Sequence, residues 1–319
     1  MNKPMENNII TVDCHYVRDQ LTASYIVKGS RESVIIETGH PGAVKHILNA
    51  LKENEISPLS ISAIFITHVH LDHCGGLSGL MKTCTNAKVY CHPRAQLHLT
   101  DPEKLIQGSK VVYGEPLFNS LYSGIEPIPN EKIVTVEDGE IIKVANNNFV
   151  FFHTAGHAKH HVCIHETTSD ALFTGDTFGL AYPDLQRGSR KFIYPATTPT
   201  DFDIAEARKS ILRIRDLKVK SIYLTHFGIW DDVNEGAVQL LFALDEIEQM
   251  QVSAQEKKLE GEALQNHCRE GLKNFILHEL EKRNLSLTTE QWKVFDYDVK
   301  LNSMGIAFAI DKARRNINR

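Results

Sequence analysis

The residues best suited to chemistry lie in the stretch IFITHVHLDHCGG (residues 64–76), which holds three histidines and an aspartate within six positions. Imidazoles and carboxylates are common ligands of divalent transition metals. His68 and His70 are two residues apart just after an apolar run, so both rings can point to one side of an extended segment. Asp72 and His73 follow on the turn and face a different point, which suits a second ion. The motif therefore predicts a metal site that needs further ligands elsewhere.

Three later segments offer those ligands, each at the end of a predicted strand. FFHTAGHAKHH supplies His157, LFTGDT supplies Asp176, and IYLTHFG supplies His226. One such residue alone is more often structural than functional. Two metal ions about 3.5–4 Å apart need a bridging carboxylate and a further histidine for each ion. Following the first motif in order, the three residues complete such a set.

These motifs resemble those of the metallo-β-lactamase-fold hydrolases, in particular their glyoxalase II-like and lactonase-like branch. The resemblance rests on THVHLDHCGG, TAGHAKHH, FTGDT and LTHFG, and it covers roughly residues 20 to 230. It implies two divalent metal ions, with zinc as the first choice and iron or manganese as the next. It also assigns ligands to a first ion, a second ion and a bridge, namely His68, His70 and His157, then Asp72, His73 and His226, and finally Asp176.

Two positions near these motifs are candidates for supporting the ligands. Glu37, in IIETG, stands where the family often has aspartate. Its longer carboxylate is expected to hold the histidine-bearing loop from behind the ligands. HAKHH adds His160 and His161, which we expect to support the ligands from behind, to be structural or to be solvent-exposed, with His161 retained as the candidate supporting residue.

The elements that must position these residues alternate between strand-like and helix-like patterns. Strands are predicted at residues 24–29, 33–38, 61–67, 87–92, 148–154, 161–167, 171–176 and 221–226, and helices at 42–54, 75–83 and 203–217. The first two strands are predicted to form a hairpin, and 132–144 a second hairpin with its turn at Asp138-Gly139. Strand-rich halves that are each closed by helices predict an αββα sandwich of the α/β (α+β) class.

The composition changes near residue 234, where helical periodicity begins and continues toward the end of the chain. We therefore predict a catalytic domain at 1–233 and a C-terminal helical extension at 234–319. Two segments with several glycines and prolines, 107–131 and 177–200, lack a regular pattern. Irregular segments of that length are predicted to be lids, binding loops or disorder.

The segment after Asp176 should overhang the metal ions and supply the contacts to the substrate. Tyr182 and Tyr194 are the candidates for donating a hydrogen bond to a substrate oxygen, with packing inside a loop as the alternative. Basic residues within 187–191 could bind an anion, although a solvated charged loop is the safer prediction. Aromatic residues in 111–124 suit an apolar pocket or a partner protein.

Composition and charge narrow the remaining classes. With 24% charged residues and a net charge of -5, the chain of 319 residues gives no electrostatic reason to expect nucleic acid. No apolar run approaches about 18 residues, and the N-terminus lacks the apolar core of a secretory signal. The six cysteines are scattered, which is typical of reduced thiols. We expect a cytoplasmic protein with a small-molecule substrate and no membrane partner, with a homodimer as one option.

Together these features predict a metal-dependent hydrolase. A water bridging two metal ions has a lowered pKa and can attack a carbonyl carbon, and Asp72 is expected to orient it and carry a proton. The ligand set suits a small ester, lactone or thioester equally. The helical extension resembles that of glyoxalase II in architecture only, so it leaves a glutathione substrate open. The alternatives are a persulfide dioxygenase with one iron, a phosphodiesterase of the same fold, and a non-catalytic regulatory scaffold.

Overall fold

A computed structural model describes residues 8–198 and 200–317 of the chain. The chain forms two compact units. The first comprises Met1–His153, His160–Gly175 and Val219–Ile229, and the second Thr154–Lys159, Asp176–Lys218 and Trp230–Arg319. The second unit thus combines two stretches of the predicted catalytic domain with the C-terminal helices, and the predicted boundary after residue 233 stays a prediction. Residues 1–7, part of the segment judged to lack a secretory signal, and position 199 of the irregular segment 177–200 lie outside the described residues.

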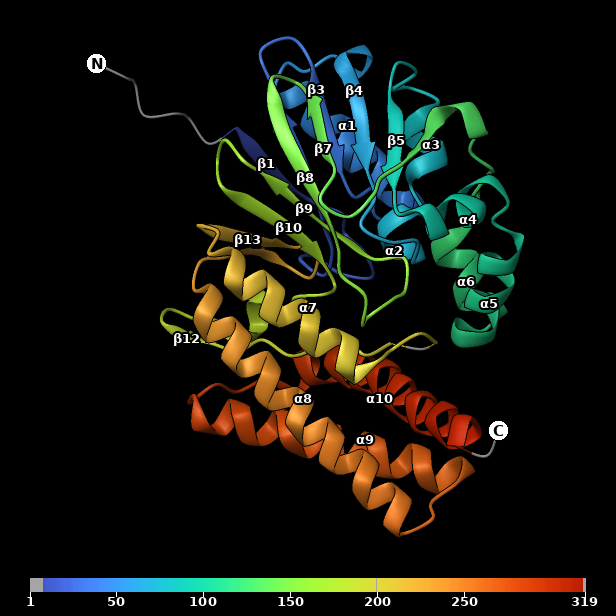
Figure 1. Cartoon of the computed structure of the whole chain (residues 1–319), viewed down its shortest axis with the longest axis vertical. Helices are drawn as coiled ribbons and strands as arrows, with labels where there is room; N and C mark the ends of the chain where they lie inside the picture. Colours follow the sequence, from blue (N-terminus) through green and yellow to red (C-terminus); the bar gives the residue numbers. More distant parts are fainter. Residues whose placement is uncertain (1–7, 199, 318–319) are drawn as a thin grey trace. The chain divides into compact units, whose positions relative to one another are not determined.

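The first unit is built on two six-stranded sheets (Figure 1). The first sheet contains, in spatial order, β1 (Ile9–Asp13), β2 (Ala23–Lys28), β3 (Ser33–Ile36), β4 (Ile61–Phe65), β5 (Lys88–Cys91) and β6 (Ile133–Thr135). The second contains β14 (Gly228–Trp230), β13 (Ser221–Leu224), β10 (Ala171–Gly175), β9 (Val162–Glu166), β8 (Asn147–His153) and β7 (Ile141–Val144). β2 and β3 pair antiparallel, which confirms the first predicted hairpin, and β3 to β6 run parallel.

Strand β4 shows how the layers of the first unit are packed. Ile64 packs in a cluster with Ile47 of helix α1 (Val44–Glu53) and Leu77 of α3 (Leu77–Met81), on one face of the first sheet. Phe65 points to the other face, where its ring centroid lies 4.9 Å from that of Phe149 in the second sheet. Successive residues of a strand face opposite sides, so a strand covered on both faces is apolar throughout. β4 is apolar except at the half-buried Ser62, and this pattern made it recognisable in the sequence.

The remaining helices of the first unit are short and flank the loops of the first sheet. They are α2 (Leu71–Cys74), α4 (Gln96–Thr100), α5 (Glu103–Tyr113) and α6 (Glu115–Tyr122). Buried Phe118 and Tyr122 of α6 join the same apolar cluster as α1 and α3. The two sheets with their helices, together with a helical C-terminal part, are the predicted α/β architecture.

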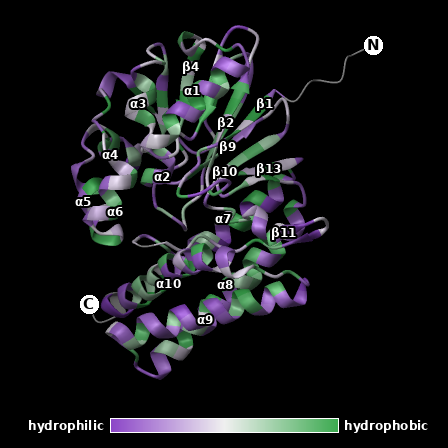
Figure 2. Cartoon of the chain, turned by 180° about the vertical axis from the view of Figure 1, so that it is seen from behind, coloured by the Kyte–Doolittle hydropathy of each residue, from purple (hydrophilic) through white to green (hydrophobic). Residues whose placement is uncertain are grey.

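The second unit consists mainly of four helices: α7 (Ile204–Leu217), α8 (Val233–Glu256), α9 (Gly261–Lys282) and α10 (Thr289–Ile317). α8 contacts both α7 and α9, and α9 contacts α10 (Figure 1). Each carries hydrophilic and hydrophobic stretches (Figure 2), as expected of helices that bury one face. The helices predicted in the C-terminal region are thus present. A small hairpin of β11 (Gln186–Arg187) and β12 (Arg190–Lys191) precedes them.

Two predictions about elements are wrong. Residues 132–144 do not form a hairpin, because β6 belongs to the first sheet and β7 to the second. The chain does turn at Gly139, whose φ is +80°, but the turn carries it from one sheet to the other. Residue types at a turn report the local bend and not the partner of each strand. A local pattern therefore could not distinguish a hairpin from a crossing.

The segment 107–131 is also not an irregular loop, since α5 and α6 occupy most of it. Its breakers lie where helices tolerate them. Gly114, with φ +76°, separates the two helices, and Pro116 lies in the first turn of α6, where no backbone N–H is needed. The segment 177–198, by contrast, has little regular structure, but its residues 192–197 are buried.

Within the described part of the chain, none of the helices is both long and apolar enough to cross a membrane. All six cysteines are buried thiols outside disulfides, and burial raises the pKa of Cys14, Cys91 and Cys268 to about 12. Such thiols stay protonated near neutral pH and are poor nucleophiles.

Candidate metal centre

Five of the seven predicted ligands lie just after strand ends, and the other two, Asp72 and His73, lie in the short helix α2. His68 and His70 lie in the loop between β4 and α2, and the loop after β8 carries His157. Asp176 comes directly after β10, and His226 lies two residues after β13. Loops at strand ends can present side chains from a rigid scaffold without breaking the sheet.

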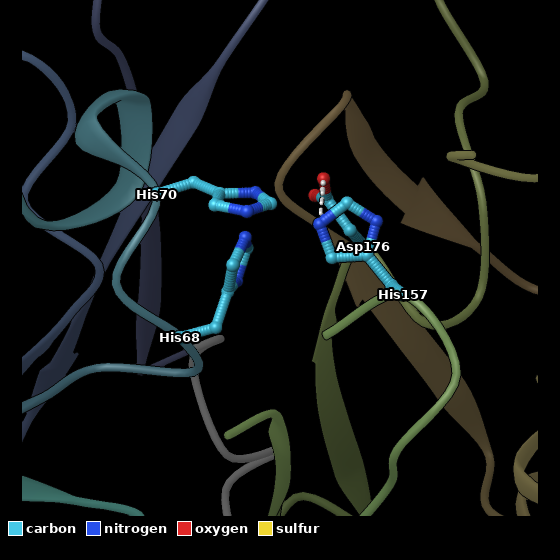
Figure 3. Close-up of side chains that lie close together, drawn as sticks. All are labelled: His68, His70, His157 and Asp176. Carbon is cyan, nitrogen blue, oxygen red and sulfur yellow. Dashed lines mark ion pairs between the residues drawn. The ribbon is translucent and has the colours of Figure 1, made fainter. Parts of the chain in front are cut away.

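Four of these residues are candidate ligands of a first ion, with His68 and His70 in the first unit and His157 and Asp176 in the second. His157 Nε2 is 3.3 Å from Asp176 Oδ2. Figure 3 shows the rings of His68 and His70 close to each other, and it also shows His157 paired with Asp176. Three imidazoles and a carboxylate match the donor types of a transition-metal site.

A second group, Asp72, His73 and His226, lies entirely in the first unit. The ligand atoms of these three residues all lie within 4.8 Å of one another. Asp72 Oδ2 is 3.7 Å from His73 Nε2 and 3.4 Å from His226 Nε2. The His73 and His226 side chains are buried, and that of Asp72 is 15% exposed. The seven predicted ligands therefore fall into two groups.

Hydrogen bonds fix the ring orientation of two of the candidate ligand histidines. His157 Nδ1 lies 3.0 Å from the carbonyl oxygen of Ala196, and His226 Nδ1 lies 2.8 Å from that of Leu21. A carbonyl oxygen only accepts, so each Nδ1 must carry the proton and donate it. In the neutral ring, Nε2 then keeps its lone pair toward the neighbouring carboxylate. A backbone acceptor behind a metal-ligating histidine is a usual support for such a ligand.

Glu37 supports the second group from a buried position. Its Oε1 accepts a hydrogen bond from the Thr67 backbone N–H at 2.7 Å, and its Oε2 pairs with His73 Nδ1. Its own carbonyl oxygen accepts from the Ser24 hydroxyl at 2.7 Å. Both carboxylate oxygens are thus engaged with the loop that carries His68 and His73. Although Glu37 also lies within ligand distance of these two histidines, its contacts fit a supporting residue better than a ligand.

The sequence of the chain is similar to those of a known protein family. A family model described as the metallo-beta-lactamase superfamily matches residues 17–226. The chain belongs to this superfamily. It is 26% identical over 214 residues to the metallo-beta-lactamase fold-containing protein ST1585 of Sulfurisphaera tokodaii, a match that covers 66% of the chain and 74% of the relative.

Other relatives are fungal. The chain is 25% identical over 223 residues to the lactamase-like protein aptB of Emericella nidulans, covering 65% of the chain and 60% of the relative. It is 28% identical over 159 residues to the atrochrysone carboxyl ACP thioesterase of Aspergillus chevalieri, covering 49% of the chain and 40% of that protein. The matches therefore span less than two thirds of either fungal protein.

Solved structures extend the likeness in fold. The crystal structure of ST1585, described as an archaeal metallo-beta-lactamase superfamily protein from Sulfolobus tokodaii, matches with a TM-score of 0.64 at 20% identity, covering 94% of the chain and 98% of that structure. The family protein TTHA1429 from Thermus thermophilus matches with a TM-score of 0.63 at 17% identity, covering 97% and 95%. Coverage this complete includes the C-terminal helices, so the superfamily fold and its helical extension are shared.

The other predicted site residues lie in defined contacts. The buried ring of His161 stacks on that of His68, with centroids 4.9 Å apart. Tyr182 and Tyr194 are buried, and both hydroxyls donate to the Asp298 carboxylate, Tyr182 at 3.2 Å. These contacts correspond to the packing alternative for the two tyrosines. A role in substrate binding stays a prediction.

The basic residues of the same segment bind the chain itself. Arg187 donates to the carbonyl oxygen of Ser286 at 3.2 Å, and Arg190 to that of Asn284 at 3.0 Å. Lys191 pairs with Asp231 at 2.5 Å. These contacts leave the three charges engaged within the second unit rather than gathered around an anion site.

A polar aromatic cluster within reach of the Asp72 charge was not predicted from the sequence. The Tyr16 and Tyr122 hydroxyls lie 2.5 Å apart, and the His40 ring centroid is 5.4 Å from that of Tyr16. Burial, then Tyr113, then the charge of Asp72 raise the pKa of Tyr16. The aromatic residues of 111–124 were a signal for half of this cluster. Tyr16, about a hundred positions earlier, carried no recognisable motif.

Proposed function

We propose that the chain is a metal-dependent hydrolase that cleaves a small ester, lactone or thioester with two divalent metal ions. The observation that carries this proposal is the presence of two ligand groups rather than one. His68, His70, His157 and Asp176 suit the first ion, and Asp72, His73 and His226 the second. The donor chemistry favours zinc first, with iron or manganese next. Membership of a superfamily composed mostly of hydrolytic metalloenzymes supports the same reading.

Bound metal ions would supply a water of lowered pKa and a Lewis acid for the scissile carbonyl. The protein's own contribution is orientation and proton transfer. Ala196 and Leu21 hold protons on the outer nitrogens of His157 and His226, so the inner nitrogens remain available as ligands. Asp72 is suited to orient the attacking water and hold its proton, because its side chain is 15% exposed against 6% for Asp176.

The bond class is the less determined part of the proposal. One fungal relative is named a thioesterase of an acyl carrier protein, which makes thioesters the first substrates to test. The acidic net charge of -5 supports a small molecule rather than nucleic acid as substrate. Lactones and simple esters need the same attack on a carbonyl carbon and follow in the screen.

The test combines elemental analysis with a substrate panel. We expect about two equivalents of metal per chain in protein purified without added metal or chelator, together with hydrolysis of at least one thioester, ester or lactone. Chelation should abolish the hydrolysis and zinc should restore it. Failure to bind metal after reconstitution would contradict the proposal and favour a non-catalytic scaffold.

A single-iron dioxygenase remains the alternative, because the first group alone provides histidines and a carboxylate for one iron. One equivalent of iron and oxygen consumption with a persulfide would favour it. Two equivalents of metal without oxygen consumption would exclude it.

A further inference from the structure

The loop that orients His157 is itself fixed by a side chain of the C-terminal helix α10. Asn302 is fully buried, and its Oδ1 accepts the Thr197 backbone N–H at 2.6 Å. The Thr197 hydroxyl in turn donates to the carbonyl oxygen of Asn302 at 3.0 Å. Thr197 directly follows Ala196, whose carbonyl oxygen accepts the proton of His157 Nδ1. Asn302 is therefore two hydrogen-bonded steps from a predicted metal ligand, all within the second unit.

The hydrogen bonds of the Asn302 amide fix its orientation. Its Nδ2 donates to the carbonyl oxygen of Asp298 at 3.0 Å and to Asp298 Oδ2 at 3.2 Å. The same carboxylate accepts the Tyr194 hydroxyl, and burial, followed by the Asp298 charge, raises the pKa of that tyrosine so that it stays a donor. A fully engaged buried network of this kind holds its members in one arrangement.

Helix α10 also approaches the loop too closely to admit a side chain. A Cβ added at Gly305, one turn after Asn302, would lie 1.6 Å from the carbonyl oxygen of Thr197. A glycine that permits such close backbone contact indicates that the helix and the loop are packed as one piece.

Segment 194–197 also fixes the backbone after Asp176. Leu180 N–H donates to the carbonyl oxygen of Tyr194 at 2.8 Å, and Gly179 N–H donates to that of Asp176 at 3.0 Å. Both His157 and Asp176 are therefore connected to the segment that Asn302 holds.

We propose that Asn302 is a positioning residue for the first metal ion: through Thr197 and Ala196 it sets the ring orientation and tautomer of His157. The inference deepens the proposed function and rests on it, since it takes His157 as a metal ligand. It gives α10 a role at the metal centre that sequence analysis left open.

The first test uses metal-free protein. Histidine ¹⁵N–¹H NMR, with His157 assigned by comparison with His157→Gln, should show the Nδ1-protonated tautomer in the unmodified chain. Asn302→Leu removes the acceptor of the Thr197 N–H while keeping a similar volume, so a mixture of tautomers is expected. Ser303→Ala is the matched control, because it removes a buried hydrogen bond to Lys300 in the same turn of α10. It should leave the His157 signals unchanged.

The second test measures metal binding to the same variants. We expect Asn302→Leu to lower the binding affinity of one of the two ions by about 10–100-fold, the usual effect of losing a residue behind a metal ligand. The affinity of the other ion should stay unchanged. Ser303→Ala should bind both as the unmodified chain does. If Asn302→Leu matches this control in tautomer and affinity, the inference is wrong.

A milder variant protects the test against misfolding. Thr197→Val removes only the hydroxyl bond to Asn302 and keeps the backbone bond, so it should shift the His157 tautomer in the same direction by less. If Asn302→Leu does not fold, an unchanged tautomer in Thr197→Val overturns the inference. Metal-free NMR also separates the two proposals. A chain that binds no metal contradicts the proposed function, while the His157 tautomer still tests the path through Asn302.

Discussion

Two histidines, one from each candidate ligand group, differ in what their Nδ1 atom contacts, although His226 of the second group contacts a backbone carbonyl as His157 does. His73 is paired with a side chain, the carboxylate of Glu37, which also holds the backbone of the same loop. His157 is paired with a backbone carbonyl, that of Ala196, on a segment with little regular structure. We call these the carboxylate-supported histidine and the carbonyl-supported histidine.

This difference determines which residues set the orientation of each histidine. A carboxylate acts directly, and changing one atom of Glu37 changes the partner of His73. A backbone carbonyl cannot be substituted, so its position must be set by other residues, here Thr197 and Asn302. A single mutation can remove the support of His73, whereas the support of His157 depends on several contacts. The two arrangements should therefore respond differently to substitution.

The largest effect is expected at Asp72, which faces the carboxylate-supported histidine. Asp72→Ala removes the carboxylate that we expect to orient water and carry a proton, so kcat should fall by about 10²–10⁴-fold. Steady-state kinetics on the best substrate of the panel would measure the change, with circular dichroism to show that the fold is kept. The control is Asp170→Ala, on the turn that joins β9 and β10, where the carboxylate contacts His165 outside both groups. Equal activity of the two variants would contradict the role of Asp72.

The next effect sharpens the comparison of the two supports. In Glu37→Gln, an amide oxygen can still accept the Thr67 N–H, but the amide N–H₂ then faces His73 Nδ1. Two donors cannot share that contact, so His73 must move its proton to Nε2, the nitrogen that faces Asp72. Metal affinity at this group should fall by about 10–100-fold.

Titration of the metal-free variant with zinc would measure that loss, while NMR would report the His73 tautomer. Asn302→Leu provides the comparison for the carbonyl-supported histidine. If Glu37→Gln loses the ion predicted for His157 instead, the assignment of the two supports is wrong.

The same difference, between support from a side chain and support from the backbone, determines which residues of the candidate site could be predicted from the sequence. The histidine motif, the candidate ligands near strand ends and Glu37 could be proposed from the sequence because side-chain type carries their chemistry and spacing carries their geometry, and their roles stay predictions. Ala196 and Leu21 act through backbone oxygens, which every residue possesses, so nothing in their identity marks them. Asn302 lies more than a hundred positions from Ala196, and a single buried asparagine in a helical pattern has no local signature.

The fold divides in a similar way. β4 was predictable because a strand buried on both faces is apolar throughout. The pairing of β6 and β7 was not, since Gly139 reports a bend without naming the partners of the strands it joins. α5 and α6 were missed because Gly114 and Pro116 were taken as signs of a loop, although both lie at helix ends. Breakers locate boundaries more reliably than they exclude helices.

A packing test comes next in size and concerns the glycine before Asp176. A Cβ at Gly175 would lie 2.5 Å from Thr67 Oγ1 and 2.6 Å from His161 Nε2. The φ of Gly175 is +48°, so Gly175→Ala should lower the free energy of unfolding by about 2–4 kcal/mol, about 1 from the left-handed backbone and about 1–3 from overpacking. Urea unfolding of metal-free protein would measure it.

Gly139→Ala is the matched control for backbone strain alone. Its φ is also positive, at +80°, but a Cβ there meets nothing within 4 Å. A cost of about 1 kcal/mol is expected from the left-handed conformation. If both variants lose the same stability, the close contact between Thr67, His161 and the end of β10 does not constrain the site.

The smallest effect tests a histidine outside both groups. His92 is buried, its ring centroid lies 4.1 Å from that of His153, and its Nδ1 accepts the Arg94 N–H at 2.9 Å. Burial, followed by the neighbouring His153 and Arg94, lowers the pKa of His92 from 6.5 to about 4. Between these values the unfolded chain binds a proton that the folded chain refuses, so stability falls as the pH drops through this window.

His92→Gln should reduce this loss of stability by at most about 1.4 kcal/mol per pH unit. Above pH 6.5 the pH dependence of stability should be the same as in the unmodified chain. Urea unfolding at pH 7 and pH 5 would measure the difference, with exposed His278→Gln on α9 as the control. Metal content should stay at the level of the unmodified chain, because His92 belongs to neither ligand group. A loss of metal in His92→Gln would show that support of the metal centre reaches beyond Glu37 and Ala196, and the two-support comparison would then be incomplete.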